Sequence, residues 1–235
     1  MRRQVAMRHG FLSTYTGMII AVNVVVFIVA ILLMGSFGED KVFSWIALKP
    51  SIIHEGGAIW TFITSMFMHG GFFHLFVNMI SLMFIGNFVE KLIGKKRFLW
   101  LYFIGGIFAG LLFVVLAIIL RPDSFVCPEL IMNMKEIPSY CLYAVGASGA
   151  IFALGGILAV LTPRLPVLVF FVIPMPMWAA MGLLMFGLWA LSLGMDIPIG
   201  NTAHLGGLMV GLGYGFYLRR KYPRKTKMIS KYFAR

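Results

Sequence analysis

The chain has few charged residues, and acidic residues are rarer in it than basic ones. Only 12% of its 235 residues are charged, and only eight are aspartate or glutamate. Hydrophobic residues make up 60% of the chain, and its mean hydropathy is +0.93. A soluble domain needs more polar surface than this, so the composition excludes one and indicates an integral membrane protein with a single compact domain.

Cysteine is also scarce, which excludes a fold built on disulfides. The two cysteines, Cys127 and Cys141, are too few for a disulfide framework, although a single bond between them stays open. A convincing cleavable signal peptide is missing too. The apolar run Met18–Met34 follows a basic start, but no small-residue cleavage site stands clearly after it. We therefore expect this run to be a retained membrane span.

Six apolar segments predict an all-α polytopic membrane protein with a bundle of six transmembrane helices. Their expected bounds are Met18–Met34, Phe72–Val89, Phe98–Leu120, Ser148–Leu161, Met177–Leu193 and Ala203–Leu218. Residues 18–218 would form the membrane domain, residues 1–17 a cytoplasmic N-terminal segment and residues 219–235 a basic cytoplasmic tail. The long first loop, residues 35–71, is apolar and contains tryptophan, which favours association with the membrane interface.

Positive charge is concentrated on one side of this topology. Six helices place both termini on the same side, and all but four of the twenty lysines and arginines fall there. Of the eight acids only Glu90 falls on that side. The positive-inside rule then predicts that both termini are cytoplasmic. It also accounts for the net charge of +12 without nucleic acid, so the expected partner is the bilayer.

Two polar residues stand at the outer ends of predicted helices. Ser148 opens the fourth helix, and His204 follows 56 residues later at the start of the sixth. A serine at a helix start is more often an ordinary N-cap. An ionisable residue within a span usually faces the bundle interior and has a function there. Because a serine hydroxyl becomes a good nucleophile when a base takes its proton, we expect a dyad of Ser148 and His204, without an orienting carboxylate.

Small residues predict that the helices of this pair approach closely. Gly207 and Gly211 lie three and seven residues after His204 on its own helix face, and Gly149 follows Ser148 directly. Small residues at such spacing let two helix backbones come together. The same stripes serve ordinary packing, but close approach is also what a hydrogen bond between serine and histidine requires.

His74 and Asn78 are candidates for stabilising an oxyanion. They lie four residues apart, on one face of the second predicted helix, which also begins at the outer surface. Both side chains can donate hydrogen bonds, and the backbone N–H of Ser148 at a helix N-terminus can join them. The alternative is that they merely hold the helices together. His69, five residues before His74, is expected to be structural or interfacial.

Together these motifs resemble those of the rhomboid intramembrane serine proteases. The matching segments are Gly146-Ala147-Ser148-Gly149 for G-x-S-G, Ala203–Gly211 for A-H-x-x-G-x-x-x-G and His74–Asn78 for H-x-x-x-N. The resemblance implies that Ser148 is the nucleophile and His204 the general base. It also implies an oxyanion hole formed by His74, Asn78 and the Ser148 amide.

The resemblance further implies that Phe152, four residues after the serine, packs on the histidine, and that Asn201 helps to shape the site. It implies a protease without metal or cofactor whose substrates are transmembrane proteins, located in the plasma membrane of a prokaryote. The sequence leaves the oligomeric state open. One rival is a catalytically inactive relative that binds membrane clients. A transporter is the other, and the absence of a mid-span carboxylate or lysine disfavours it.

Overall fold

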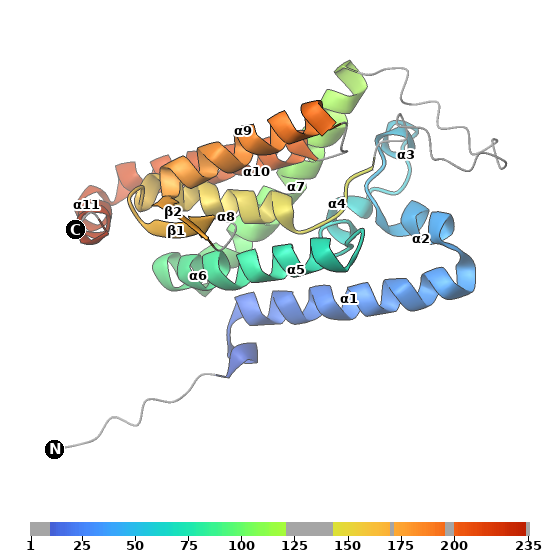
Figure 1. The fold of residues 1–235 in the computed structure, drawn as a ribbon, viewed down its shortest axis with the longest axis horizontal. Helices are drawn as coiled ribbons and strands as arrows, with labels where there is room; N and C mark the ends of the chain where they lie inside the picture. Colours follow the sequence, from blue (N-terminus) through green and yellow to red (C-terminus); the bar gives the residue numbers. More distant parts are fainter. Residues whose placement is uncertain (1–9, 121–142, 170–171, 196–199, 234–235) are drawn as a thin grey trace.

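The computed structural model describes residues 10–120, 143–169, 172–195 and 200–233. Cys127 and Cys141 lie outside the described residues. The described part is mostly helical (Figure 1). Its helices are α1 (Tyr15–Phe37), α2 (Glu39–Ile46), α3 (Pro50–His54), α4 (Thr61–Thr64), α5 (Phe72–Ser81), the π-helical segment η2 (Leu82–Gly86), α6 (Asn87–Ile93), α7 (Lys95–Leu120), α8 (Ser148–Leu161), α9 (Met177–Met195), α10 (Asn201–Lys221) and α11 (Pro223–Tyr232), after a short 3₁₀ turn η1 (Phe11–Ser13).

Apolar helices long enough for a membrane dominate the chain. Among the described residues, three segments have the length and composition to cross a bilayer: Tyr15–Phe37, Phe72–Ile93 and Lys95–Ile119. The second of these runs through α5, η2 and α6. Ser148–Leu161 and Met177–Ser192 are apolar but shorter. These features are those of an integral membrane protein, while the count of six spans stays a prediction.

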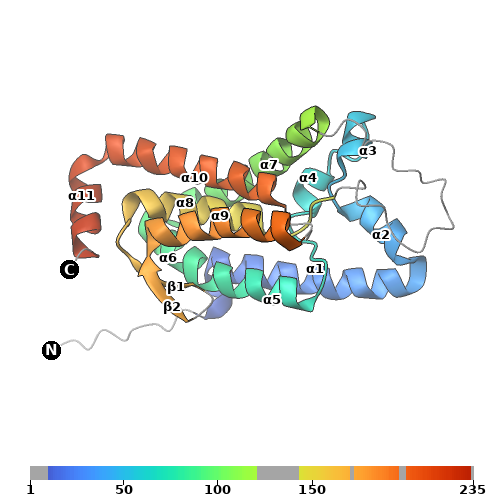
Figure 2. The ribbon, with the colours of Figure 1, turned by 45° about the horizontal axis from the view of Figure 1, so that its top comes forward.

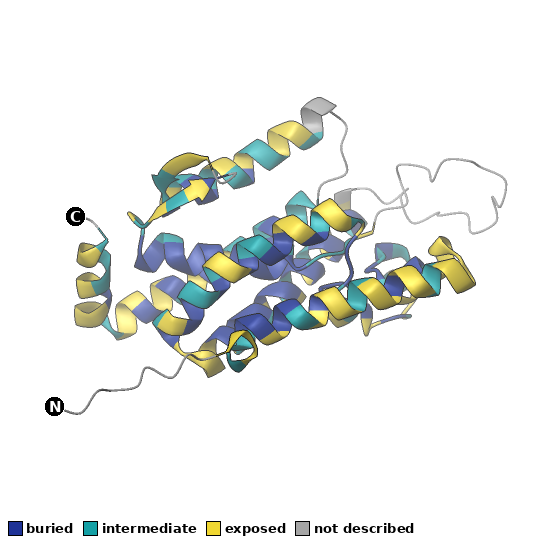
Figure 3. Ribbon diagram, turned by 60° about the horizontal axis from the view of Figure 1, so that its bottom comes forward, coloured by how far each residue is buried: buried dark blue, intermediate teal, exposed yellow. Residues whose placement is uncertain are grey.

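Helix α8 lies at the centre of the molecule. Helices α7 and α10 pack along it, and α9 lies beside it (Figures 1 and 2). Every residue of α8 is buried except Ser148 and Ala159, and the interior of the bundle is correspondingly dark in Figure 3. A helix that is apolar on all sides is stable only when it is covered on all sides, and the composition of α8 therefore fixes its central place.

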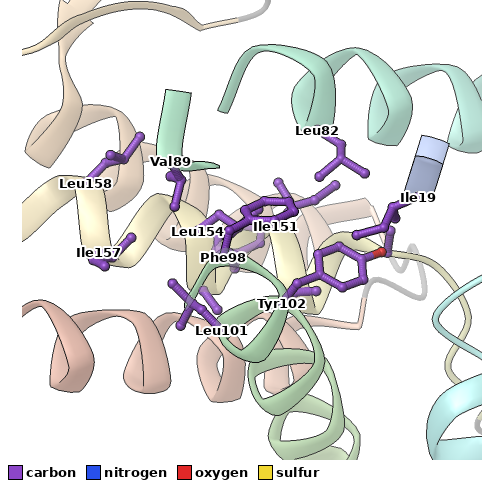
Figure 4. Close-up of a cluster of buried hydrophobic side chains, with 14 of the residues drawn as sticks. Ile19, Leu82, Val89, Phe98, Leu101, Tyr102, Ile151, Leu154, Ile157 and Leu158 are labelled. Carbon is purple, nitrogen blue, oxygen red and sulfur yellow. The ribbon is translucent and has the colours of Figure 1, made fainter. Parts of the chain in front are cut away.

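The core is formed where α7, α8 and η2 meet. Phe98 and Tyr102 of α7 are fully buried, and they belong to one hydrophobic cluster with Leu154 and Leu158 of α8 and Leu82 of η2 (Figure 4). On both α7 and α8 the two residues are four positions apart, which places them on one helix face. This core holds α8 in position, and α8 carries Ser148 at its first residue.

The first loop is tied to the segment that leads into α8. The indole Nε1 of Trp60 donates a 2.9 Å hydrogen bond to the carbonyl of Trp45. Leu48 and Ala144 form an isolated antiparallel bridge with N···O distances of 3.1 and 2.9 Å. Both sets of contacts lie at the end of the bundle where α8 begins (Figure 1). The loop therefore helps to fix the turn that precedes Ser148.

The opposite end of the bundle is held by a buried carboxylate. Glu90 of α6 accepts hydrogen bonds from the backbone N–H groups of Tyr15 and Thr16, at 3.1 and 2.8 Å, and from the Thr16 hydroxyl at 2.8 Å. The first N–H groups of a helix have no partner within the helix, and the helix dipole favours negative charge there. Glu90 thus joins α6 to the start of α1.

The segment after Leu218, where the sequence predicts the last span to end, is also helical. Helix α10 continues to Lys221, and α11 (Pro223–Tyr232) then turns across the end of the bundle (Figure 2). Proline at the first position of a helix is favourable, so Pro223 starts α11 instead of preventing it.

The expectation of an all-α fold is wrong at the connection between α8 and α9. This connection contains an antiparallel hairpin of β1 (Pro166–Val169) and β2 (Ile173–Pro176). A two-stranded hairpin has only edge strands, where proline is tolerated because its missing N–H can face away from the partner strand. The prolines of this connection are therefore compatible with strands.

Candidate active site

A tight turn before α8 positions Ser148. Gly146 has a φ of 113°, in a region that side chains rarely adopt, and its N–H donates to the carbonyl of Ser65 at 2.8 Å. A Cβ on Gly146 would lie 2.9 Å from Nε2 of His74. Glycine is required here both for the backbone conformation and for the close passage of the chain against the imidazole of His74.

Ser148 and His204 lie within hydrogen-bonding distance. The distance from Ser148 Oγ to His204 Nε2 is 2.8 Å. Ser148 is the first residue of α8, and His204 is in the first turn of α10, so both side chains stand at the same end of their helices. His204 is only 8% exposed, whereas Ser148 is half-buried.

Backbone contacts between α8 and α10 make this distance possible. A Cβ on Gly207 would collide with the carbonyl oxygen of Gly149, and one on Gly211 would collide with that of Ala153. The two helices therefore touch backbone to backbone, as small residues allow in membrane proteins. The glycine stripe predicted from the sequence lies in this interface.

Phe152 covers one face of the His204 ring. The two ring centroids are 4.5 Å apart and the planes differ by 14°, which is a stacked arrangement. Nδ1 of His204 is buried and has no hydrogen-bond partner among the described residues. Within the described chain, stacking on Phe152 thus orients the imidazole, where a carboxylate does so in many serine hydrolases.

His74 and Asn78 both lie beside the turn that precedes Ser148. The position of a Gly146 Cβ is 2.9 Å from His74 Nε2 and 3.9 Å from Asn78 Nδ2. Nδ2 of Asn78 donates to the carbonyl of His74 at 2.9 Å, which leaves the second amide hydrogen free for another acceptor. Four segments, the ends of α5, α8 and α10 and the turn at Gly146, therefore meet at one place.

Asn201 is less closely connected to this place. It is the first residue of α10, three positions before His204, and its Oδ1 is buried without a partner among the described residues. No hydrogen bond joins Asn201 to Ser148 or His204 within the described chain. Those residues also contain no group of three histidine, cysteine, aspartate or glutamate side chains that could hold a metal ion.

His69, which the sequence predicts to be structural or interfacial, is a neighbour of the site. It is 3% exposed, its ring centroid is 5.1 Å from that of His74, and its Nδ1 lies 3.3 Å from the carbonyl oxygen of Phe67. Burial, and then the neighbouring His74, lower the pKa of His69 to about 4. The only signal in the sequence was a second histidine five residues before the first, which has no helical spacing.

Comparison with known proteins identifies the family of this chain. The rhomboid domain matches residues 56–221. RHOMBOID-like protein 5 of Arabidopsis thaliana is 33% identical over 173 residues, which cover 73% of this chain and 48% of that protein. Inactive RHOMBOID-like protein 8 of the same plant is 45% identical over 73 residues, covering 31% and 19%.

A bacterial protein is also similar. Rhomboid protease GluP of Bacillus subtilis is 30% identical over 148 residues, covering 63% of this chain and 24% of that protein. The chain thus spans less than half the length of each of these relatives. The rhomboid domain takes in Ser148, His204, His74 and Asn78 together, and it covers most of the chain. The protein therefore belongs to the rhomboid family.

Proposed function

We propose that the protein is an intramembrane serine endopeptidase in which Ser148 is the nucleophile and His204 the general base. The observation that carries this proposal is the 2.8 Å contact between Ser148 Oγ and His204 Nε2. Two groups from helices that start 53 residues apart meet there, in a part of the molecule where apolar contacts would be expected. Membership of a family that includes a protein named as a protease supports the same chemistry.

The proton transfers follow from this geometry. His204 holds its resting proton on Nδ1, so that Nε2 can accept the Ser148 hydroxyl proton as Oγ attacks the substrate carbonyl carbon. When the peptide C–N bond breaks, Nε2 gives this proton to the leaving amine. Water then attacks the acyl ester, losing a proton to Nε2, and the proton returns to Ser148 Oγ. Proteolysis on this scheme uses no metal and no cofactor.

The oxyanion of the tetrahedral intermediate needs donors that are already in place. The Ser148 N–H at the start of α8, the His74 imidazole and the free amide hydrogen of Asn78 are the donors we assign to it. Supporting this assignment, His74 and Asn78 adjoin the Gly146 turn, two residues before the nucleophile. Loss of one such donor slows catalysis by about 100- to 1000-fold in other hydrolases, and we expect the same of His74→Ala and Asn78→Ala.

The membrane arrangement we propose has six spans: α1, α5–η2–α6, α7, α8, α9 and α10. The short helix α8 can serve as a span because other helices cover it, so that its ends need not reach lipid. Residues 18–218 form the membrane domain, and the first loop is associated with the outer surface. The positive-inside rule places both termini in the cytoplasm, with the plasma membrane of a prokaryote as the proposed location.

The substrates we propose are transmembrane segments of other membrane proteins. The carbonyls of an intact helix are hydrogen-bonded within it, so a substrate must unwind locally before Ser148 can reach the scissile bond. Small or helix-breaking residues near the cut are therefore expected. Among the supporting residues, Phe152 orients His204 and Asn201 shapes the mouth of the site.

A second candidate function is binding of membrane proteins without cleavage. The observation that favours it is the 45% identity over 73 residues to Inactive RHOMBOID-like protein 8. In this chain, however, both the hydroxyl and the imidazole that catalysis requires are present and in contact.

Labelling with a fluorophosphonate, followed by cleavage of a single-span membrane protein, separates the two functions. A protease is labelled at Ser148 and cuts the substrate, and Ser148→Ala loses both properties. Ser36→Ala is the matched control, because Ser36 is exposed near the C-terminal end of α1 and, among the described residues, its hydroxyl bonds only to the carbonyl of Leu32, at 3.3 Å. Cleavage that persists in Ser148→Ala would refute the assignment of the nucleophile.

A further inference from the structure

A groove between α8, α9 and α10 lies at the end of the bundle opposite Ser148. Its volume is about 310 Å³, at the lower end of the range of about 300–1,000 Å³ that ligand sites occupy. Trp178 and Gly182 of α9 line one side, and Leu212 and Phe216 of α10 line the other. These residues stand four positions apart on their helices, so each helix offers one continuous stripe to the groove.

The side chains at the rim are open to the surroundings of the protein. Trp178 is 61% exposed and Phe216 is 57% exposed. In a protein embedded in a membrane, apolar side chains exposed at this depth face lipid instead of water. The apolar walls of the groove are therefore suited to the acyl chain of a lipid.

One end of the groove is lined by a positively charged side chain. Arg219 lines it, three residues after Phe216 and seven after Leu212, on the same face of α10. Arg219 belongs to the last turn of the helix, and Arg164 is exposed directly after Pro163, which also lines the groove. In the part of the chain that the structure describes, no carboxylate lines the groove. The groove thus combines an apolar length with a cationic mouth.

We propose that this groove binds one anionic phospholipid, with an acyl chain between α9 and α10 and the phosphate at Arg219 and Arg164. Arginine is well suited to phosphate because its planar guanidinium can donate two parallel hydrogen bonds. Aromatic side chains such as Trp178 are favoured at the level of the headgroups. The proposal concerns lipid binding alone and does not depend on proteolysis, so each can fail without the other.

Native mass spectrometry of the purified protein tests the headgroup. The probes are phosphatidylglycerol and phosphatidylcholine with identical acyl chains, and we expect preferential retention of one phosphatidylglycerol. Arg219→Gln should weaken this retention about fivefold, which corresponds to about 1 kcal/mol for one cation near an anionic surface. Lys221→Gln is the matched control: it removes the same charge two residues later, but Lys221 points to Tyr217, whose hydroxyl lies 2.8 Å from its Nζ.

A second pair of variants tests the groove itself. Gly182 lines it, and a Cβ added there would meet no atom within 4 Å, so Gly182→Leu introduces an apolar side chain at the wall of the groove without a clash at its first atom. Gly187→Leu is the control on the same helix, outside the groove, where the nearest atom to an added Cβ is 3.9 Å away. We expect loss of the bound lipid in Gly182→Leu only. Equal retention of the two lipids, or equal behaviour within either pair of variants, would overturn the proposal.

Discussion

Helix α8 meets α10 and α9 through two very different interfaces. Toward α10 the contact is backbone against backbone, with Gly207 facing the carbonyl of Gly149 and Gly211 facing that of Ala153. Toward α9 the contact is made by methionine, since Gly155 faces the side chain of Met181. Backbone contacts leave no freedom of adjustment, whereas methionine is flexible and fills irregular space.

This difference corresponds to the position of the side chains that we propose to be catalytic. Ser148 and His204 stand on α8 and α10, and a hydrogen bond tolerates only a few tenths of an ångström. The rigid interface is the one that fixes their distance. No such constraint acts on α9, so its interface with α8 can be adaptable. The predictions that follow test this contrast, beginning with the largest effect.

Gly211→Ala should be the most damaging small substitution. The new Cβ would lie 2.8 Å from the carbonyl carbon of Ala153, and backbone on a buried helix cannot move aside. We expect a loss of about 3 kcal/mol of stability, as for strong overpacking, together with loss of fluorophosphonate labelling at Ser148. Thermal unfolding in detergent and the labelling yield measure the two effects.

Gly213→Ala provides the control for this prediction. It makes the same change two residues later on α10, where a Cβ would meet no atom within 4 Å. Alanine should leave labelling unchanged there and raise stability by up to about 1 kcal/mol through its better helix propensity. Similar behaviour of Gly211→Ala and Gly213→Ala would show that the interface of α8 and α10 is not rigid.

His69 lies beside His74, close to the end of the bundle where Ser148 and His204 meet. Its pKa is lowered to about 4 because it is buried and has His74 as a neighbour. The unfolded chain binds a proton at this residue near its ordinary pKa of 6.5, while the folded protein does so only near pH 4. Stability from the neutral His69 is therefore complete above pH 6.5 and falls as the pH drops toward 4, by about 3 kcal/mol in total.

Replacing His69 with glutamine should remove this dependence. We expect the thermal midpoint of the wild-type protein to fall more between pH 7.5 and pH 5 than that of His69→Gln. His54→Gln is the comparison, because His54 is exposed, on α3. Parallel curves for wild type and His69→Gln would show that His69 is accessible to protons in the folded state.

Phe152→Leu should have a smaller effect that is confined to catalysis. In the wild-type protein the ring centroids of Phe152 and His204 are 4.5 Å apart. Leucine keeps the site apolar but cannot stack on the His204 ring. Stacking is worth about 0.5–1.5 kcal/mol, so kcat should fall by about 2- to 10-fold with little change in KM. Ile151→Leu, a conservative change at the adjacent buried residue, should leave kcat unaffected. An unchanged kcat in Phe152→Leu would show that another contact orients the imidazole.

The sequence predicts those parts of the molecule that depend on strong local signals. The bounds of α8 follow from a glycine turn before Ser148 and a proline after Leu161, and they agree with the structure. The stripe of Gly207 and Gly211 predicts the close approach to α10, because only small residues permit it. Each of these features requires a particular residue at a particular place.

Features that depend on tertiary contacts could not be predicted in this way. The burial of His69 depends on how its loop folds back against α5, which no local pattern encodes. The start of α11 after Lys221 is marked only by Pro223, a residue that also ends helices. The hairpin of β1 and β2 contains prolines that usually argue against strands, and only the pairing of Pro166 with Pro176 reveals it.

The smallest effect, and the sharpest test of the contrast, is expected for Gly155→Ala. A Cβ there would lie 2.5 Å from Sδ of Met181 and 2.8 Å from its Cε, so an added Cβ meets an obstacle at Gly155 as it does at Gly211. The obstacle is now the far end of a flexible side chain, which can rotate away. Stability should therefore change by less than about 1 kcal/mol, and labelling of Ser148 should persist. If Gly155→Ala is as damaging as Gly211→Ala, α9 is held as firmly as α10, and the adaptability of its interface must be abandoned.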